Sequence, residues 1–184
     1  MARQTVEERH AQLITLGRQL FSTLPYDSIS TDDIARAAGI SKGLLYHYFP
    51  GKREYYVATV RSLADELLAL LDFEVTGDVG VAVEQTLRRF LDFIETNAAM
   101  YQALLRGGIG MDPEVYGLVE GVRRTVAERI RELVGLRDEP LVRLRLHGWL
   151  GFAESTSLEW LAHREIDREN LLQLWLEQFV ALAA

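Results

Sequence analysis

The residues best suited to chemistry lie in one short stretch, Ile40–Arg53, which reads ISKGLLYHYFPGKR. It combines hydroxyl, imidazole and ammonium groups, all of which donate hydrogen bonds to anionic oxygens. Flat aromatic rings can also rest on sugars or on a thymine methyl group. If a helix begins at Ser41, the free backbone N–H groups of its first turn attract anions as well. The stretch therefore favours contact with a phosphate-bearing partner.

Enzymatic chemistry is not indicated elsewhere in the chain. There is no cysteine, which excludes disulfides, thiolate metal sites and cysteine nucleophiles. Glu154 and Glu159 would lie about 140° apart around a helix, so they do not face one substrate as acid and base. The histidines are not at metal-ligand spacing, and the glycines of residues 107–110, which we interpret as a linker, lack the Lys-Ser or Lys-Thr of a phosphate loop. We expect no catalytic residue, no metal and no cofactor.

Charge is distributed unevenly along the 184 residues, whose net charge is −7. Residues 1–61 contain 8 Lys and Arg against 6 Asp and Glu, a balance of +2, which leaves −9 for the remainder. This split favours a polyanion-binding first part only slightly, because random surface variation also produces it. The first ten residues are polar, and no stretch of about 18 uncharged apolar residues follows. We therefore expect a cytoplasmic protein that does not contact a membrane.

Hydrophobic residues repeat with a helical period throughout, and no alternating strand pattern or internal repeat is present. The sequence therefore predicts an all-α fold of about nine helices. Caps, prolines and glycines set the boundaries, beginning with a capping box at Thr5 and Glu8. The predicted helices are Thr5 to Pro25, Ser30 to Gly39, Ser41 to Pro50, Lys52 to about Phe73, Val79–Asn97, Ala98–Arg106, Asp112–Val134, Glu139–His163 and Asp167–Ala183.

The segment Ala38–Ser41 joins two short helices through a glycine and opens the second with a hydroxyl cap, as in a helix-turn-helix unit. On the second helix Ile40, Leu45 and Phe49 share the inward face. The outward face then carries Lys42, Gly43, Tyr46 and His47, with Tyr48 beside them. We interpret this as a recognition helix for the major groove, although the tyrosines could instead be ordinary packing residues. The expected domains are a three-helix DNA-binding domain at 1–51 and a helical ligand-binding and dimerisation body at 52–184.

Residues Thr5–Lys52 resemble the N-terminal domain of the tetracycline-repressor (TetR) family of bacterial transcriptional repressors. The resemblance rests on Ile29, Ser30, Thr31, Ile34, Ala35, Ala38, Gly39, Ile40, Ser41, Lys42, Gly43, Leu45, Tyr46, Tyr48, Phe49 and Lys52. It covers about a quarter of the chain, and the remaining helices match the family only in number and length.

The resemblance implies roles for individual residues. The implied DNA-contact region comprises Thr31, Ser41, Lys42, Gly43, Tyr46, His47, Tyr48 and Lys52. Thr31, Lys52 and the aromatic residues of 46–48 would contact the phosphate backbone, and residues 42–43 would approach base edges. This sequence departs from the family pattern at Leu44, where many relatives have a hydroxyl residue, and at Asp32, where some have a basic one.

The end of the chain offers a surface for pairing. The last helix is apolar nearly all round, at Leu171, Leu172, Leu174, Trp175, Leu176, Phe179, Val180 and Leu182. The helix before it carries small residues at near-helical spacing, which are Gly148, Gly151, Ser155 and Ala162. We expect these two helices to form a four-helix interface with their copies in a homodimer, the alternative being burial within one subunit.

The middle helices contain many aromatic residues, most of which we expect in the core. The family holds a ligand cavity between these helices, and an apolar cavity with a few polar groups is the usual design. The candidate lining residues are Phe90, Phe93, Tyr101, Met111, Tyr116, His147, Trp149, Phe152 and Glu154.

The predicted function is sequence-specific, DNA-binding transcriptional regulation. We expect a homodimeric repressor that a small-molecule effector releases from a palindromic double-stranded DNA operator by changing the distance between the two recognition helices. Three alternatives stay open. They are a DNA-binding regulator with no small-molecule effector, an all-helical enzyme, and a purely structural dimer.

Overall fold

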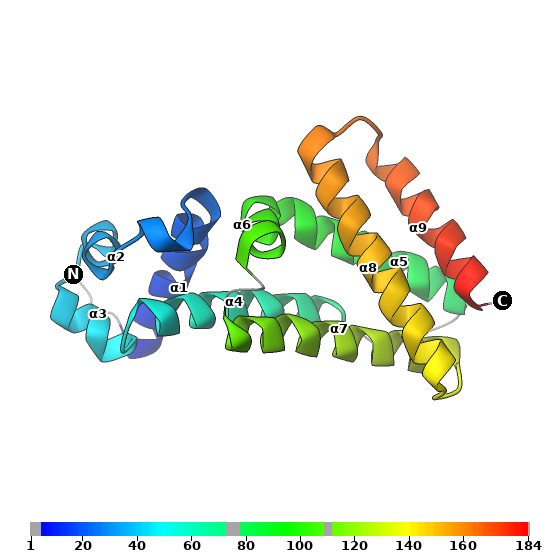
Figure 1. The fold of residues 1–184 in the computed structure, drawn as a ribbon, viewed down its shortest axis with the longest axis horizontal. Coiled ribbons are helices and arrows are strands. Elements are labelled where there is room, and N and C mark those ends of the chain that lie inside the picture. Colours follow the sequence, from blue (N-terminus) through cyan, green and yellow to red (C-terminus); the bar gives the residue numbers. More distant parts are fainter. Residues whose placement is uncertain (1–4, 73–77, 109–111, 184) are drawn as a thin grey trace. The chain divides into compact units, whose positions relative to one another are not determined.

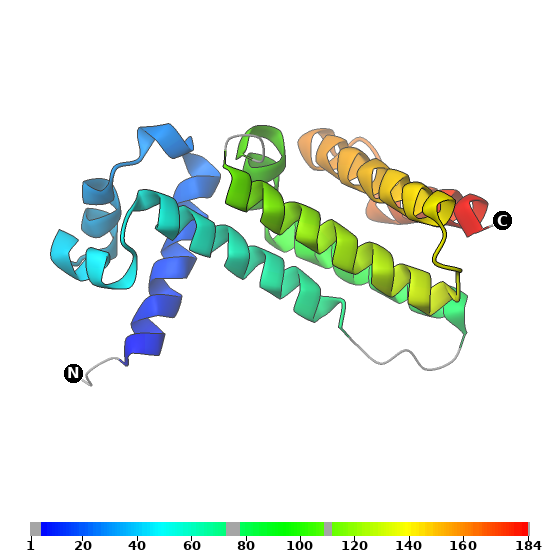
Figure 2. The ribbon, with the colours of Figure 1, turned by 60° about the horizontal axis from the view of Figure 1, so that its bottom comes forward.

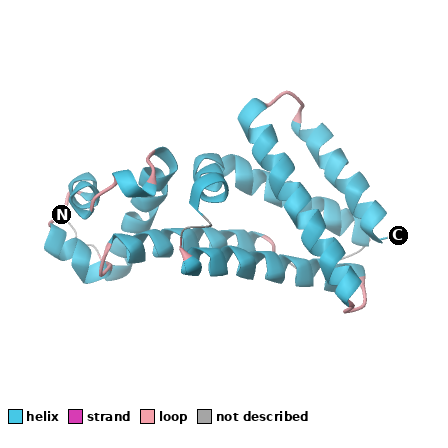
Figure 3. Cartoon of the chain, viewed as in Figure 1, coloured by secondary structure: helices cyan, strands magenta, loops and turns pink. Residues whose placement is uncertain are grey.

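A computed structural model of the chain describes residues 5–72, 78–108 and 112–183, and within these ranges every regular element is helical (Figure 1, Figure 3). The elements are α1 (Val6–Thr23), a 3₁₀ turn (Tyr26–Ser28), α2 (Thr31–Ala38), α3 (Lys42–Tyr48), α4 (Lys52–Leu70), α5 (Val79–Thr96), α6 (Ala98–Ala103), a π-helix (Leu104–Gly108), α7 (Pro113–Val134), α8 (Pro140–His163) and α9 (Arg168–Ala183). The all-α prediction is confirmed, and the nine described α-helices match the expected number.

One expected helix differs from the prediction. The helix predicted over Ala98–Arg106 is regular only to Ala103 and continues as a π-helix to Gly108. Glycine is about 1 kcal/mol less favourable than alanine in an α-helix, so the glycines at 107 and 108 disfavour a regular end. The predicted end of α4 near Phe73 lies outside the described residues.

The chain packs into two compact units. Unit 1 comprises Met1–Asp65 and Ala99–Leu118, and unit 2 comprises Glu66–Ala98 and Val119–Ala184. Helices α4 and α7 contribute residues to both. The division into domains at 1–51 and 52–184 stays a prediction.

Unit 1 is organised around the crossing of α1 and α4, which Figure 2 shows at the start of α4. The two helices approach closely at Gly17, where an added Cβ would lie only 3.1 Å from the Tyr55 ring and closer still to Thr59. The Tyr55 hydroxyl donates to the Leu13 carbonyl across the crossing at 2.5 Å, and burial raises the pKa of this hydroxyl. The small residue at 17 therefore sets the spacing of the helices that support α2 and α3.

Unit 2 has its core between α5, α8 and α9, and α8 and α9 run side by side (Figure 1). Trp175 is fully buried and its indole N–H donates to Thr156 Oγ1 at 2.8 Å. The rings of Trp149 and Phe179 meet edge to face with centroids 5.2 Å apart. The buried apolar residues of α9 thus pack within unit 2.

Candidate nucleic-acid interface and ligand cavity

Local hydrogen bonds fix the turn between α2 and α3. Ser30 and Asp33 form a capping box at the start of α2, in which each side chain accepts a hydrogen bond from the other residue's backbone N–H. Gly39 ends α2 with φ = 65°, a left-handed conformation that residues with a Cβ adopt at a cost. The Ser41 hydroxyl then accepts a hydrogen bond from the Leu44 N–H at 3.2 Å and opens α3. The residues Gly39 and Ser41 therefore determine the angle at which α3 leaves the turn.

Burial of one face of α3 decides which side chains point outward. Leu45 and Phe49 are 2% and 4% exposed. The Phe49 ring contacts His10 of α1 at 5.1 Å and Tyr55 of α4 at 4.9 Å between centroids. Helices α1 and α4 thus contact α3 on its inward face, which the sequence predicts to carry Leu45 and Phe49.

The outward face of α3 is accessible. Lys42, Gly43 and His47 are exposed, and Tyr46 and Leu44 are 44% and 39% exposed. The apolar side chain of Leu44 therefore lies beside the polar side chains of this face. Tyr46 is therefore not an ordinary packing residue within unit 1.

Tyr48 and Thr31 are less accessible than these residues of α3. Tyr48 is half-buried, and its ring centroid lies 6.5 Å from that of His10 and 5.5 Å from that of His47. Thr31 is the first residue of α2 and is half-buried. Both side chains therefore keep part of their surface accessible.

An ion pair crosses the turn and was not anticipated from the sequence. The Lys42 ammonium lies 2.9 Å from the Asp32 carboxylate, and the side chains are 44% and 61% exposed. The hydrogen bond to Asp32 raises the pKa of Lys42. The only signal in the sequence is an acid and a base on either side of a turn, which by itself does not specify a contact.

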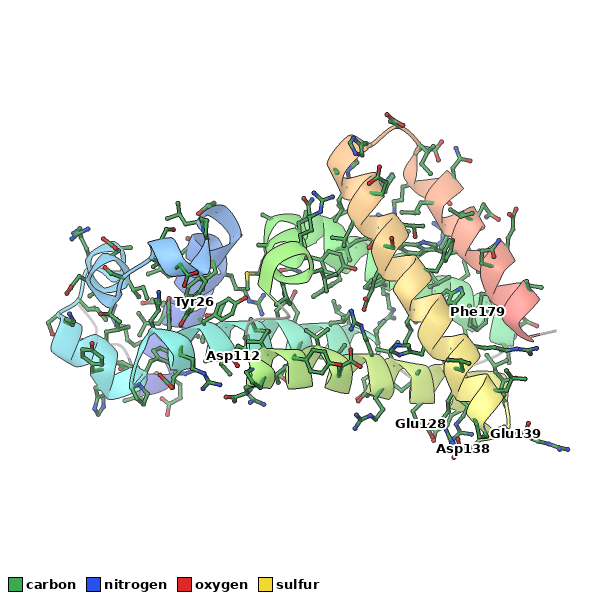
Figure 4. All side chains as sticks on the ribbon, viewed as in Figure 1. Tyr26, Asp112, Glu128, Asp138, Glu139 and Phe179 are labelled. Carbon is green, nitrogen blue, oxygen red and sulfur yellow. The ribbon has the colours of Figure 1, made fainter. Side chains whose placement is uncertain are left out.

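Lys52 is turned toward the protein. Its ammonium donates to the Tyr26 carbonyl at 3.1 Å and lies 4.2 Å from the centre of the Tyr26 ring. Figure 4 labels Tyr26, which follows α1 and lies beside the first turns of α4. Burial is the first cause of a raised pKa at Tyr26. The hydrogen bond and the ring contact therefore hold the Lys52 ammonium beside Tyr26 and restrict the movement of its alkyl chain.

Three of the candidate ligand residues line one cavity in unit 2. Phe90, Trp149 and Glu154 surround a volume of about 60 Å³, with α4 and α7 completing its wall. Arg123 of α7 also lines it and binds Glu154 through both carboxylate oxygens, with Nη2 to Oε2 at 2.6 Å. This hydrogen bonding raises the pKa of Arg123.

Arg123 also donates to Glu120, one turn earlier in α7. Sequence reasoning missed Arg123, although it adjoins the apolar series Val119, Val122 and Val126 of the same helix. A charged residue at the edge of an apolar stripe is the signal that could have identified it.

The other candidate ligand residues do not line this cavity. Phe93 is buried, Phe152 is half-buried, and His147 is exposed. Tyr101 is buried and Tyr116 is 52% exposed, and both belong to unit 1. Met111 lies outside the described residues.

Unit 1 contains a larger and more open hollow of about 590 Å³. Its wall includes Phe21, Tyr26 and Tyr56 on one side and Ala99, Met100 and Leu104 on the other. None of the candidate ligand residues lines it.

The exposed face of α8 carries the small residues singled out in the sequence. Gly148, Gly151, Ser155 and Ala162 are all exposed, and a Cβ added at either glycine would meet nothing within 4 Å. Leu144 of α8 and Val180 of α9 are each 67% exposed. Exposed apolar and small side chains thus lie on both α8 and α9.

Metal-binding clusters and membrane-spanning helices are absent from the described ranges. No cluster of three or more His, Cys, Asp or Glu side chains there could hold a metal ion. No helix in those ranges combines the length and the apolar character needed to cross a membrane.

Comparison with known proteins gives matches in both parts of the chain. Residues 13–59 match the family model for bacterial regulatory proteins of the tetR family, and residues 79–182 match a tetracyclin repressor-like C-terminal domain. The solved structure of a tetR-family transcriptional regulator from Streptomyces coelicolor is similar over 97% of this chain and 82% of its own, with 35% identity and a TM-score of 0.87.

Two curated relatives differ in the direction of regulation. The transcriptional activator FasR of Mycolicibacterium smegmatis is 25% identical over 174 residues, covering 91% of this chain and 79% of its own length. The negative regulator of the icaADBC biofilm operon, IcaR of Staphylococcus aureus, is 26% identical over 128 residues, covering 68% and 67%.

Proposed function

Because this chain belongs to the TetR family of DNA-binding transcriptional regulators, we propose that it acts as a homodimeric repressor that leaves a palindromic operator when a small molecule binds its body. The observation that carries the proposal is the accessible outward face of α3, supported from behind by Leu45 and Phe49. Related regulators act in both directions, FasR as an activator and IcaR as a negative regulator, and repression is typical of the family.

The proposed contacts with DNA divide by role. Lys42 and Gly43, in the first turn of α3, would approach base edges, where a lysine finds acceptors such as guanine N7 and O6. Tyr46 and His47 would donate to phosphate oxygens. The complete proposed set is Thr31, Ser41, Lys42, Gly43, Tyr46, His47, Tyr48 and Lys52. Of these, Ser41 acts through the cap that orients the first turn, and Lys52 through a restrained ammonium beside Tyr26.

Binding of DNA by α3 is tested first by selection. The chain is incubated with random duplexes, and the recovered sequence is used in gel shifts. Tyr46→Ala is expected to weaken binding at least about tenfold, because it removes a phosphate donor and a ring, each worth about 1 kcal/mol. Tyr116→Ala is the matched control, since it is also an exposed tyrosine. Equal binding by both variants would refute the assignment of α3.

The proposed dimer joins α8 and α9 to their copies, since a small reading helix gains useful affinity by binding two half-sites. The exposed small residues of α8 permit the close helix contact that such an interface needs. Gly151→Leu tests this, because the subunit has open space at that position while a partner helix would be displaced. Gly117→Leu, at an exposed glycine of α7 that also has open space, is the control. Sedimentation should show monomers only for the first variant.

The proposed effector site is the unit 2 cavity lined by Phe90 and Trp149. At about 60 Å³ it is well below the 300 Å³ or more typical of small-molecule sites, so the ligand has to widen it. Widening would shift the helices that line it and thereby favour one body conformation. The small volume is also the observation that favours the second candidate function, a DNA-binding regulator with no small-molecule effector.

A thermal-shift screen of small molecules separates these two functions. Phe90→Trp would fill the cavity and should abolish the shift given by a true effector. Ala99→Trp would fill the hollow of unit 1 and is the control. If only Ala99→Trp abolishes the thermal shift of a ligand, the effector site lies in unit 1. A screen in which no compound shifts the melting temperature would favour the regulator that has no effector.

A further inference from the structure

The surface formed by α2 and α3 contains very little uncompensated positive charge. Residues 31–48 include two Lys or Arg residues, Arg36 and Lys42. Arg36 lies 2.8 Å from Asp33, and Lys42 lies 2.9 Å from Asp32. Both acids belong to the first turn of α2. A surface that faces a polyanion thus has each of its cations bound to a carboxylate.

Asp32 takes no part in the capping box that starts α2. The capping box at that end uses Ser30 and Asp33, which bond each other's backbone N–H groups. The side chain of Asp32 extends across the turn to Lys42, ten residues later. Exposed ion pairs contribute little to folding stability. The contact between Asp32 and Lys42 therefore calls for an explanation in what the surface binds.

The carboxylate has two effects on the ammonium. It neutralises the positive charge of Lys42, which would otherwise attract any phosphate. Such attraction between cations and phosphates is the main source of non-specific DNA binding. It also occupies one of the three N–H donors of Lys42 and fixes the direction of the other two. Donors with fixed directions are suited to an acceptor on a base edge, because that acceptor has one defined position. They are less suited to the phosphate backbone, which offers many acceptor positions.

We propose that Asp32 is a specificity-determining residue, which holds Lys42 for base-edge recognition and weakens binding to non-operator DNA. The proposal rests on the proposed function, because it assumes that α3 reads a duplex. It assigns to Asp32 a role opposite to that of a phosphate-binding residue: its presence lowers affinity for non-operator DNA more than affinity for the operator, and thereby raises the ratio of specific to non-specific affinity.

The magnitude follows from counterion release. Freeing one cation for one phosphate steepens the slope of log affinity against log salt by about 0.9, which corresponds to about fivefold tighter binding at 0.15 M salt. Asp32→Asn should show this gain on non-operator DNA. On the operator, where Lys42 faces a base edge, the gain should be at most about twofold, so that the specificity ratio falls about threefold.

The experiment uses the full chain, a duplex selected from random sequence by the wild-type protein, and a scrambled duplex of the same composition. Fluorescence anisotropy titrations over a series of salt concentrations give both affinities and both slopes. Asp138→Asn is the matched control, because Asp138 also forms an exposed ion pair, with Arg143, and its loss changes net charge equally. This control should leave the specificity ratio unchanged.

The Asp32→Asn change is repeated in a Lys42→Ala background. The proposal requires that the gain on scrambled DNA disappears there, because Asp32 acts through Lys42. A gain that persists without Lys42 would mean direct repulsion of phosphates and would overturn it. So would an unchanged specificity ratio in Asp32→Asn. If the wild-type chain selects no duplex at all, the proposed function itself fails, whereas a selected duplex with an unchanged ratio overturns only the role of Asp32.

Discussion

Replacing Gly17 with alanine tests the helix crossing that supports the proposed DNA-binding surface. A Cβ at this position would lie inside van der Waals distance of Thr59 Oγ1, and 3.1 Å from both the Cζ atom and the hydroxyl of Tyr55. Thr59 is fully buried and its hydroxyl donates to the Tyr55 carbonyl at 2.8 Å, so it cannot yield without losing that bond. The new methyl group therefore has to push α1 and α4 apart.

The expected cost can be worked from these contacts. Overpacking a core by one methyl group costs about 1–3 kcal/mol, and the threatened hydrogen bond about 1 kcal/mol. Alanine returns about 1 kcal/mol through its better helix propensity. We expect Gly17→Ala to lower the free energy of unfolding by about 2 kcal/mol, or Tm by about 4–8 °C for a chain of this size.

Thermal and urea unfolding followed by circular dichroism measure this change at a fixed chain concentration, because the proposed dimerisation would make Tm concentration-dependent. Gly121→Ala is the control. A Cβ at this position would have no atom within 4 Å, so the substitution should leave the free energy of unfolding unchanged or raise it. In a Thr59→Ala background the cost of Gly17→Ala should fall by about 1–2 kcal/mol. If Gly17→Ala is as stable as Gly121→Ala, the close crossing of α1 and α4 is wrong.

Two further predictions concern ion pairs. The hydrogen bond from Arg53 Nε, 2.7 Å from the carboxylate of Asp112, is the first cause of a lowered pKa at Asp112. A pKa lower in the folded than in the unfolded state gives stability that is present above the unfolded value of about 3.9 and is lost as pH falls through the folded value. Unfolding titrations should therefore show a smaller loss of stability below about pH 4 in Asp112→Asn than in the wild type, and equal acid sensitivity would contradict the pairing. Glu154→Ala should lower the free energy of unfolding by about 2 kcal/mol, because Arg123 loses its bidentate partner in a site where both side chains are 21% exposed. Glu159→Ala, at a side chain 73% exposed that pairs with His163, should change stability by less than about 0.5 kcal/mol.

The sequence by itself determined the local structure of α1, α2 and α3, the part proposed to bind DNA. Thr5, Ser30 and Ser41 cap their helices with partners three residues away, and Gly39 adopts its left-handed conformation without help from distant residues. The inward face of α3 follows from the helical period, which puts Leu45 and Phe49 on one side. These features depend on neighbours in the chain, and their signals are therefore complete in the sequence.

Only the tertiary structure decided what the charged groups contact. Lys42 could have pointed to solvent, but the turn brings it to Asp32, and Lys52 reaches Tyr26 because α4 packs beside the end of α1. Arg123 meets Glu154 across 31 residues, through the packing of α7 on α8. A helical period assigns each side chain to a face but does not say which element covers that face. The sequence therefore named Glu154 without its partner, and it grouped Tyr101 with cavity residues that belong to the other compact unit.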